Sequence, residues 1–268
     1  MTMMLSPDLL DRRALALIAL RDAFGRPVRS PVHVTGEGVR ALIKKDGTIA
    51  VLDAPGFGGH IGAFSEPPAN PAIGSKPIPI AIEPSDPALQ ARHYVLALPR
   101  DPDPANRAQP NSLFRAAQVS LLATPQQKRE GLACVLRVCV HRKGDGAAIG
   151  GALVRARSDN GKFEAMGVTD KAGEAALVFP DLPVAFPGAG GNMDPALPAK
   201  AIVKVVQASA VFTPKDSLRT PGGAVARKAG PFDPDKLASG PAPDFAGGTP
   251  FLLSAGTEPA IELEWLQP

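Results

Sequence analysis

The chain has 268 residues, which is enough for one large domain or for two domains of ordinary size, each with its own core. Its 30 prolines and 27 glycines argue against long helices. The 29 basic and 26 acidic residues leave a net charge of only +3, and the basic residues are scattered. Because a nucleic-acid-binding surface needs clustered positive charge, we expect no nucleic-acid partner.

Aromatic residues make up only 5% of the chain, and Tyr94 and Trp265 are its single tyrosine and tryptophan. Sugar-binding sites and single-strand nucleic-acid sites commonly use aromatic side chains as stacking platforms. The scarcity of aromatic residues therefore counts against both kinds of site.

An apolar run near the N-terminus, residues 14–20, does not have the flanking residues of a signal peptide. Asp11 precedes it, Arg21 and Asp22 follow it, and no small-residue cleavage signal ends it. No run in the chain approaches the ~20 apolar residues of a membrane span. We expect neither secretion nor a membrane-spanning segment.

The two cysteines, Cys134 and Cys139, lie five positions apart in one expected strand. At ~3.3 Å per residue they are ~16 Å apart, which is too far for a disulfide. Free thiols are typical of a reducing compartment. The sequence therefore predicts a cytoplasmic protein, or part of a particle assembled in the cytoplasm.

In chain order, the first group of expected elements starts with a strand at residues 14–20 and a polar turn that includes Gly25. A short apolar segment at residues 28–34 comes next, and the glycine turn Lys45-Asp46-Gly47 precedes a strand at residues 48–52. Residues 54–57 close the group with a proline-containing apolar segment. Short strands divided by glycine turns at this spacing are typical of a β-sandwich.

The same order of elements returns in the second half of the chain. A strand at residues 132–140 leads through a glycine turn to a strand at residues 149–156. The turn Thr169-Asp170-Lys171-Ala172-Gly173 then precedes a strand at residues 174–179, and residues 180–183 close the group. The repeat predicts two related sandwich modules in an all-β protein.

Alternation of apolar and polar residues supports strands over helices. In residues 132–141 the even positions are all apolar, whereas the odd face carries Arg137, Cys139 and His141. The C-terminal segment alternates in the same way, with Ile261, Leu263 and Trp265 on one side and Glu262 and Glu264 on the other. We expect this segment to pack on a module, with Trp265 buried, and residues 201–212 to form a central strand.

Proline-rich stretches at residues 99–118 and 214–250 sustain neither helical nor strand periodicity. We therefore expect an N-terminal module at residues 1–98, a linker at 99–118 and a second module at 119–213. Residues 214–268 form an irregular proline- and glycine-rich segment that ends in the packed strand.

The second module resembles a known family. The strand that includes Val138 and Val140, the run Gly151-Ala152-Leu153-Val154-Arg155 and the Thr169–Gly173 turn are similar to the carboxypeptidase-regulatory-like, or transthyretin-like, β-sandwich. The resemblance covers roughly residues 130–212. Residues 14–98 depart from it, because Lys45-Asp46-Gly47 stands where the fuller Thr-Asp turn belongs, and there the assignment rests on the repeat. The resemblance implies a seven-stranded accessory or assembly module and brings no catalytic residues.

A metal site is not expected, although Cys134, Cys139 and His141 are residue types that bind zinc. Strand parity points Cys134 to the face opposite Cys139 and His141, and the other histidines are isolated in sequence: His33, His60 and His93. Whether Cys139 and His141 have a chemical role is left open.

Two pairs of carboxylates have a spacing that calcium loops also use: Asp101 with Asp103, and Asp233 with Asp235. Neither pair has the glycine and distal glutamate of an EF-hand. Proline lies between the two aspartates of each pair, so a rigid turn explains both motifs. The sequence leaves open whether either pair binds a cation.

Enzymatic signatures are missing from the sequence: a nucleophile elbow, a paired-histidine zinc helix and a phosphate-binding glycine loop. We expect no catalytic residues, no cofactor and no enzyme. The sequence favours a structural component of a larger assembly of protein subunits, such as a phage tail-like, baseplate or contractile injection machine. The alternative is a ligand-binding or adhesion module that recognises a glycan or a surface protein.

Overall fold

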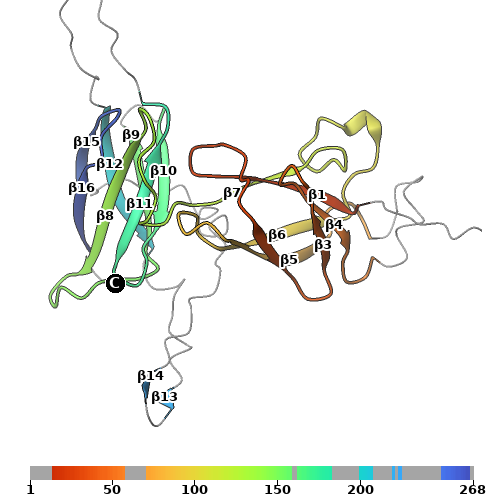
Figure 1. The fold of residues 1–268 in the computed structure, drawn as a ribbon, viewed down its shortest axis with the longest axis horizontal. Helices are drawn as coiled ribbons and strands as arrows, with labels where there is room; N and C mark the ends of the chain where they lie inside the picture. The colour runs from red at the N-terminus through yellow and green to blue at the C-terminus, as the bar shows by residue number, and fades with distance from the viewer. Residues whose placement is uncertain are drawn as a thin grey trace, which may run out of the picture. The chain divides into compact units, whose positions relative to one another are not determined.

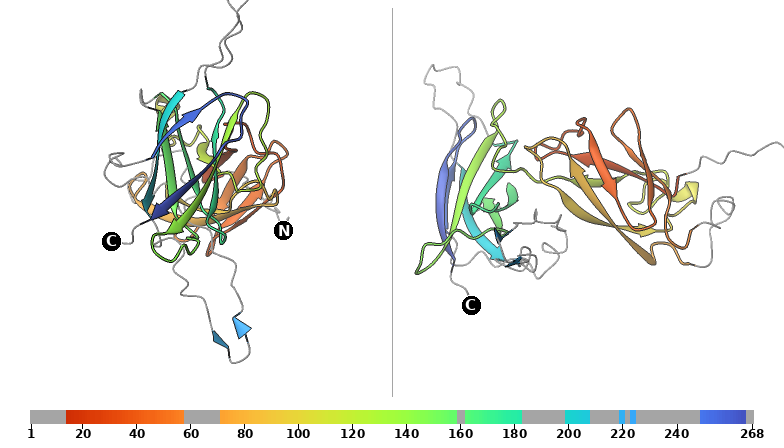
Figure 2. Two further views of the ribbon diagram at one scale, coloured as in Figure 1. Left: turned by 90° about the vertical axis from the view of Figure 1, so that its left-hand side faces the viewer. Right: turned by 60° about the horizontal axis from the view of Figure 1, so that its bottom comes forward.

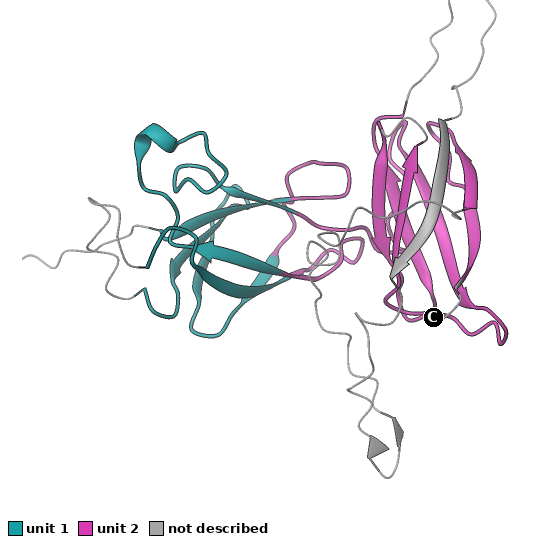
Figure 3. Cartoon of the chain, turned by 180° about the vertical axis from the view of Figure 1, so that it is seen from behind, with its two compact units in different colours: residues 1–20, 32–82, 94–119 teal, residues 21–31, 83–93, 120–268 magenta. Residues whose placement is uncertain are grey.

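The computed structural model describes residues 14–57, 71–158, 162–182, 199–207, 219–220, 223–224 and 249–265. Every regular element in them is a β-strand, apart from the three-residue 3-10 helix η2 (Pro104–Asn106). This confirms the all-β class. The chain forms two compact units (Figures 1 and 3). Unit 1 comprises Met1–Leu20, Val32–Ile82 and Tyr94–Val119, and unit 2 comprises Arg21–Pro31, Glu83–His93 and Ser120–Pro268.

Unit 1 is built on seven strands in two sheets. One sheet has the order β3-β4-β1-β7, from β1 (Ala16–Arg21), β3 (Arg40–Ile43), β4 (Ile49–Asp53) and β7 (Ala117–Ser120). The other has the order β2-β5-β6, from β2 (Val32–Thr35), β5 (Lys76–Pro84) and β6 (Arg92–Leu98). Alternate residues of β1 and β5 are buried, among them Ile18 and Ile80, because one face of each strand lines the core.

Unit 2 also has seven strands in two sheets, which Figure 2 shows from two further sides. The order β10-β9-β12-β15 joins β9 (Leu153–Ser158), β10 (Glu164–Val168), β12 (Ala199–Gln207) and β15 (Thr249–Leu253). The order β11-β8-β16 joins β8 (Cys134–Arg142), β11 (Glu174–Phe179) and β16 (Ala260–Trp265). The two-residue strands β13 (Arg219–Thr220) and β14 (Gly223–Ala224) pair separately. One apolar cluster joins the four-stranded and the three-stranded layer, since it contains Leu136, Val154, Leu177 and Leu263.

The burial pattern of β8 confirms the expected parity. Cys134, Leu136, Val138 and Val140 are buried, while the opposite face is only partly covered from Arg137 onward. Val135 is an exception, because Ala123, Ala176 and Val178 cover it on the outer face of the sheet. The β12 strand lies between β9 and β15, which confirms the central position of the expected strand as far as Gln207, and residues 208–212 lie outside the described residues.

The C-terminal strand packs in unit 2, as expected, but its direction differs from the antiparallel arrangement predicted for both modules. β16 runs parallel to β8, with Ile261 opposite Val138 and Leu263 opposite Val140. The strand before it, β15, lies in the other sheet, so the connection crosses between layers and is not a hairpin. The side chain of Trp265 lies outside the described residues.

The two groups of repeated elements share one pairing and differ in another. β1 pairs antiparallel with β4, and β8 pairs antiparallel with β11. The strand that comes before β4 and the strand that comes before β11, however, have different partners: β3 pairs with β4, whereas β10 pairs with β9. In unit 1, β3 therefore lies in the same sheet as β1 and β4, whereas in unit 2 β10 lies in the sheet opposite β8 and β11.

The hydrogen bonds of the aspartate turn at Asp170–Glu174 recur at Asp22–Arg26. In both Asp22–Arg26 and Asp170–Glu174 the first amide donates to the fifth carbonyl, at 2.9 and 2.8 Å. In both, the aspartate Oδ1 accepts the amides of the third and fifth residues. Gly25 and Gly173 hold the fourth position, with φ of 78° and 79°. The turn at Lys44–Thr48 has the same backbone bond, since the Lys44 amide donates to the Thr48 carbonyl at 2.8 Å, and Gly47 has a φ of 82° at the fourth position. Its aspartate, Asp46, stands at the third position, so it lacks the side-chain part of the pattern that Asp22 and Asp170 share.

Residues 99–118, for which we expected a linker, fold with unit 1. Arg100 is buried, and one of its guanidinium nitrogens donates to the carbonyls of Pro110, Ser112 and Arg115. Backbone bonds between Asp101 and Asn111 and between Leu113 and Asp101 close the loop. The proline content misled the prediction because a buried arginine can satisfy the carbonyls of a loop that has no strand partner. Most of residues 214–250 lie outside the described residues.

Candidate functional site

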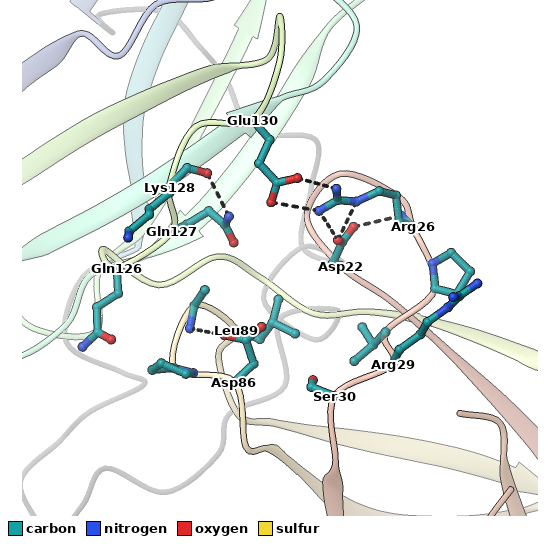
Figure 4. Close-up of a pocket in the computed structure, with 14 residues that line it drawn as sticks. Asp22, Arg26, Arg29, Ser30, Asp86, Leu89, Gln126, Gln127, Lys128 and Glu130 are labelled. Atoms are coloured by element: carbon teal, nitrogen blue, oxygen red, sulfur yellow. Dashed lines mark hydrogen bonds and ion pairs between the residues drawn. The ribbon is translucent and has the colours of Figure 1, made fainter. Parts of the chain in front are cut away.

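A pocket of about 520 Å³ is the candidate binding site of unit 2 (Figure 4). Three segments of that unit line it: residues 22–30, residues 86–89 and residues 126–130. Val28 and Leu89 are buried among its apolar lining. A pocket of this size that combines apolar walls with a few polar groups is typical of ligand sites in proteins.

The three lining segments are tied to one another by hydrogen bonds. The amide of Thr124 donates to the carbonyl of Ala88 at 2.9 Å, and its hydroxyl donates to the carbonyl of Pro87 at 2.6 Å. The amide of Ser85 donates to the carbonyl of Pro31 at 2.8 Å. These bonds hold the three segments of the pocket wall to one another.

One wall of the pocket is an arginine held between two carboxylates. Arg26 donates from Nη1 to Glu130 Oε2 at 2.5 Å, and from Nε to Asp22 Oδ2 at 2.9 Å. The two partners raise the pKa of Arg26, and the hydrogen bond from Arg26 lowers the pKa of Glu130. The guanidinium also lies 4.5 Å from the ring centroid of Phe24. Because Arg26 is hydrogen-bonded to both carboxylates, we assign these three side chains a structural role.

Three polar side chains face the interior of the pocket: those of Ser30, Asp86 and Gln127. Gln127 is buried, with 6% of its surface exposed, and it donates from Nε2 to the carbonyl of Lys128 at 3.0 Å. Asp86 uses Oδ1 to accept the amide of Ala88 at 2.9 Å. The buried Oγ of Ser30 has no hydrogen-bond partner among the described residues. Figure 4 shows these three side chains directed into the pocket.

A second candidate surface is the edge strand β3 of unit 1. It ends the order β3-β4-β1-β7, so its outer backbone edge pairs with no other strand in that sheet. Leu42 is 55% exposed and Ile43 is 42% exposed. Adjacent residues point to opposite faces of a strand, so apolar side chains are open on both faces of this edge. Such an edge is suited to contact with another chain.

Cys139 and His141 remain on the outer face of β8, apart from the buried Cys134. The strand register places Glu174 and Glu262 on either side of Cys139. Partial burial, followed by these two carboxylates, raises the pKa of the Cys139 thiol. The thiol is therefore protonated at neutral pH, which makes it a poor nucleophile. Among the described residues no three histidine, cysteine, aspartate or glutamate side chains are grouped so that they could hold a metal ion.

The carboxylates of Asp101 and Asp103 are used in turns. Asp101 accepts the amide of Asp103 at 2.9 Å with Oδ1 and the Nδ2 group of Asn106 at 2.8 Å with Oδ2. Asp103 caps η2 by accepting the amide of Ala105 at 2.8 Å. These bonds support the rigid-turn interpretation. Asp233, Asp235 and His60 lie outside the described residues, and His33 and His93 are on β2 and β6.

Sequence reasoning missed the pocket because its polar residues come from three loops with no shared motif. Asp86 and Gln127 looked like ordinary turn and loop residues. One sequence signal was available at Asp22, since Asp22-Ala23-Phe24-Gly25 matches Asp170-Lys171-Ala172-Gly173 in the positions of aspartate and glycine.

Comparisons with known proteins give no family. No family model matches the chain, and no curated relative is found. Among solved structures, the minor pilin GBS52 of Streptococcus agalactiae is 9% identical, with 84% of this chain and 66% of that chain covered and a TM-score of 0.26. The TIE protein of Bacillus anthracis is 10% identical, with 94% of this chain and 34% of that chain covered and a TM-score of 0.25. The shaft pilin spaA of Lactobacillus rhamnosus GG is 10% identical, with 71% of this chain and 64% of that chain covered and a TM-score of 0.21. The chain spans about two thirds of the length of each pilin and about a third of the length of the TIE protein. TM-scores of this size carry no functional argument, so function is argued from the residues.

Proposed function

We propose that this chain is a non-enzymatic component of a larger protein assembly, in which it binds neighbouring subunits. The observation that carries the proposal is the open edge of β3, where Leu42 and Ile43 are exposed next to unpaired backbone groups. Soluble chains usually protect such edges with charge, proline or a covering segment. Pairing with a strand of another subunit would cover both the backbone and the apolar side chains.

The use of the buried polar residues supports a structural role. Arg92 donates from Nη1 to the carbonyl of Ser120 at 2.6 Å. Thr169 donates to the carbonyl of Ile149 at 2.6 Å and accepts the amide of Ala152 at 2.7 Å. Arg100 braces the loop at residues 101–115. These groups hold backbone in place.

Assembly can be tested in the cell's own lysate. Leu42→Lys or Ile43→Lys would place a charge on the β3 edge, and we expect each variant to leave the high-mass fraction that the full chain occupies. Phe114→Lys is the matched control, because Phe114 is 57% exposed but lies outside the strands. Near-native circular dichroism would show that the variants fold. A wild-type chain that is monomeric in its native lysate would overturn the proposal.

The specific assembly that we propose is a phage tail-like, baseplate or contractile injection machine, built in the cytoplasm. It rests on an analogy at the level of the all-β fold and on the two-unit organisation. No helix in the described part of the chain is long and apolar enough to cross a membrane. Copurification of the chain with tail-tube or sheath subunits would support this assignment.

The second candidate function is a ligand-binding or adhesion module, and the pocket of unit 2 favours it. This function requires no oligomeric assembly, so the same lysate experiment separates the two. A monomeric chain that binds a surface protein or a glycan in isolation would promote this candidate over the first.

A further inference from the structure

The lining of the pocket of unit 2 includes hydrogen-bond acceptors that a ligand could use. We propose that it receives the cationic side chain of a lysine or arginine from a segment of a partner protein. This inference rests on the proposed function, because it assigns the kind of group through which a partner subunit contacts unit 2.

The first support is the set of acceptors without donors. The Ser30 Oγ, the Gln127 Oε1 and the Asp86 Oδ2 have no hydrogen bond among the described residues, whereas the Nε2 of Gln127 and the Oδ1 of Asp86 are both engaged. Of these three atoms the Ser30 Oγ is the one buried from solvent, and a buried polar atom without a partner is costly, so a donor from outside stabilises the site. Lysine and arginine side chains carry only donors, together with a positive charge.

The second support is the charge at the middle of the pocket. The carboxylates of Asp22, Asp86 and Glu130 line it, and Arg26 is the cation bonded to two of them. The other two cations of the lining, Arg29 and Lys128, are exposed, and Figure 4 shows their charged groups turned outward. Asp22 and Glu130 are thus paired with Arg26, whereas Asp86 has no ion pair among the described residues, and its carboxylate favours a cation.

The third support is rigidity. Arg137 donates from Nη2 to the carbonyl of Gln127 at 2.6 Å, and Arg137 is itself paired with Glu258. The amide of Gln127 donates to the carbonyl of Thr124 at 2.9 Å. The Gln127 side chain is thus positioned before any ligand arrives, which reduces the entropy cost of binding. Val28 and Leu89 provide apolar contact for the methylene groups of a lysine or arginine.

The test uses three acetylated and amidated tripeptides, Leu-X-Leu, in which X is lysine, norleucine or glutamate. Each is titrated into the isotopically labelled full chain, and the backbone amide signals of Ala88, Leu89 and Lys128 are followed by NMR. We expect saturable shifts with the lysine peptide and an affinity at least about tenfold higher than for norleucine. Shifts of the Thr48 amide, far from the pocket lining, should stay small.

Asp86→Asn is the diagnostic variant, because asparagine keeps the Oδ1 acceptor of the turn but removes the charge and replaces the Oδ2 acceptor with an amide donor. It should weaken the lysine peptide at least about tenfold. Asp46→Asn is the matched control, since Asp46 accepts the amide of Thr48 in a similar turn and does not line the pocket. Ser30→Ala is a second variant that tests the hydroxyl with little risk to folding, and we expect a smaller loss.

Equal affinity for the lysine and norleucine peptides would overturn the proposal in favour of apolar contact alone. A preference for the glutamate peptide would assign the pocket to anions, and the absence of saturation with all three would show that it is not a site. None of these results affects the β3-edge experiment. Failure of this inference is therefore distinguishable from failure of the proposed assembly.

Discussion

Arg26 and Glu130, 104 residues apart in the chain, are joined by two hydrogen bonds. The Nη1 atom lies 2.5 Å from Oε2 and the Nη2 atom lies 3.2 Å from Oε1. Because Arg26 also binds Asp22, the guanidinium fastens the turn at residues 22–26 to the segment that carries Gln127. This pair closes one wall of the pocket.

The Arg26–Glu130 pair predicts a pH dependence of the stability of unit 2. The hydrogen bond from Arg26 lowers the pKa of Glu130 below its ordinary value of 4.5, against a small opposing effect of burial. A carboxyl with a lowered folded-state pKa contributes stability above its ordinary pKa and loses that contribution as the pH falls through the folded value. Glu130→Gln should therefore cost at most about 1 kcal/mol at neutral pH, since the pair is exposed. The difference from wild type should vanish well below pH 4.5. Urea unfolding at both pH values measures it, and a pH-independent difference would contradict the prediction.

Two glycines with the same backbone conformation should tolerate alanine differently. A Cβ on Gly173 would lie 2.7 Å from the carbonyl oxygen of Val140, whereas a Cβ on Gly25 meets no atom within 4 Å. We expect Gly25→Ala to cost about 1 kcal/mol for positive φ alone. Gly173→Ala should cost about 2–4 kcal/mol, because the backbone must also shift. Thermal unfolding compares the two variants, and equal losses would show that the close approach to Val140 is not decisive.

Thr169 should be more important for stability than an exposed strand threonine. Its fully buried Oγ1 donates to the carbonyl of Ile149 and accepts the amide of Ala152. Thr169→Val keeps the shape but leaves two buried backbone groups without this partner, so we expect a loss of about 2–3 kcal/mol in the free energy of unfolding. Thr35→Val on the exposed face of β2 is the control and should change it by about 0.5 kcal/mol or less. Similar losses in chemical denaturation would mean that the hydroxyl of Thr169 is dispensable.

The C-terminal strand should contribute to the core of unit 2 through Leu263. This side chain is 5% exposed, whereas Leu252 on β15 is 56% exposed. Leu263→Ala should cost about 2–5 kcal/mol, and Leu252→Ala about 0.5 kcal/mol or less. The two leucine variants differ only in burial, so their midpoints of denaturation give a direct comparison. A melting temperature unchanged by Leu263→Ala would place β16 at the periphery.

Some features followed from local sequence alone. The alternation in residues 132–141 identified a strand with one buried face, because the side-chain period of a strand is fixed by its backbone. The turn at Thr169–Gly173 was recognisable because aspartate and glycine satisfy its hydrogen bonds and its positive φ within five residues. The C-terminal strand was recognisable for the same reason as β8.

Other features were decided only by the tertiary structure. The parallel pairing of β16 with β8, the different layers of β3 and β10 and the folding of residues 99–118 with unit 1 all depend on backbone hydrogen bonds or on a buried arginine. Main-chain donors and acceptors are the same at nearly every residue, so they leave no mark on the sequence. The pocket is decided in the same way. Asp86, Gln127 and Ser30 are ordinary residues of separate loops, and they form a site only because the fold brings those loops together.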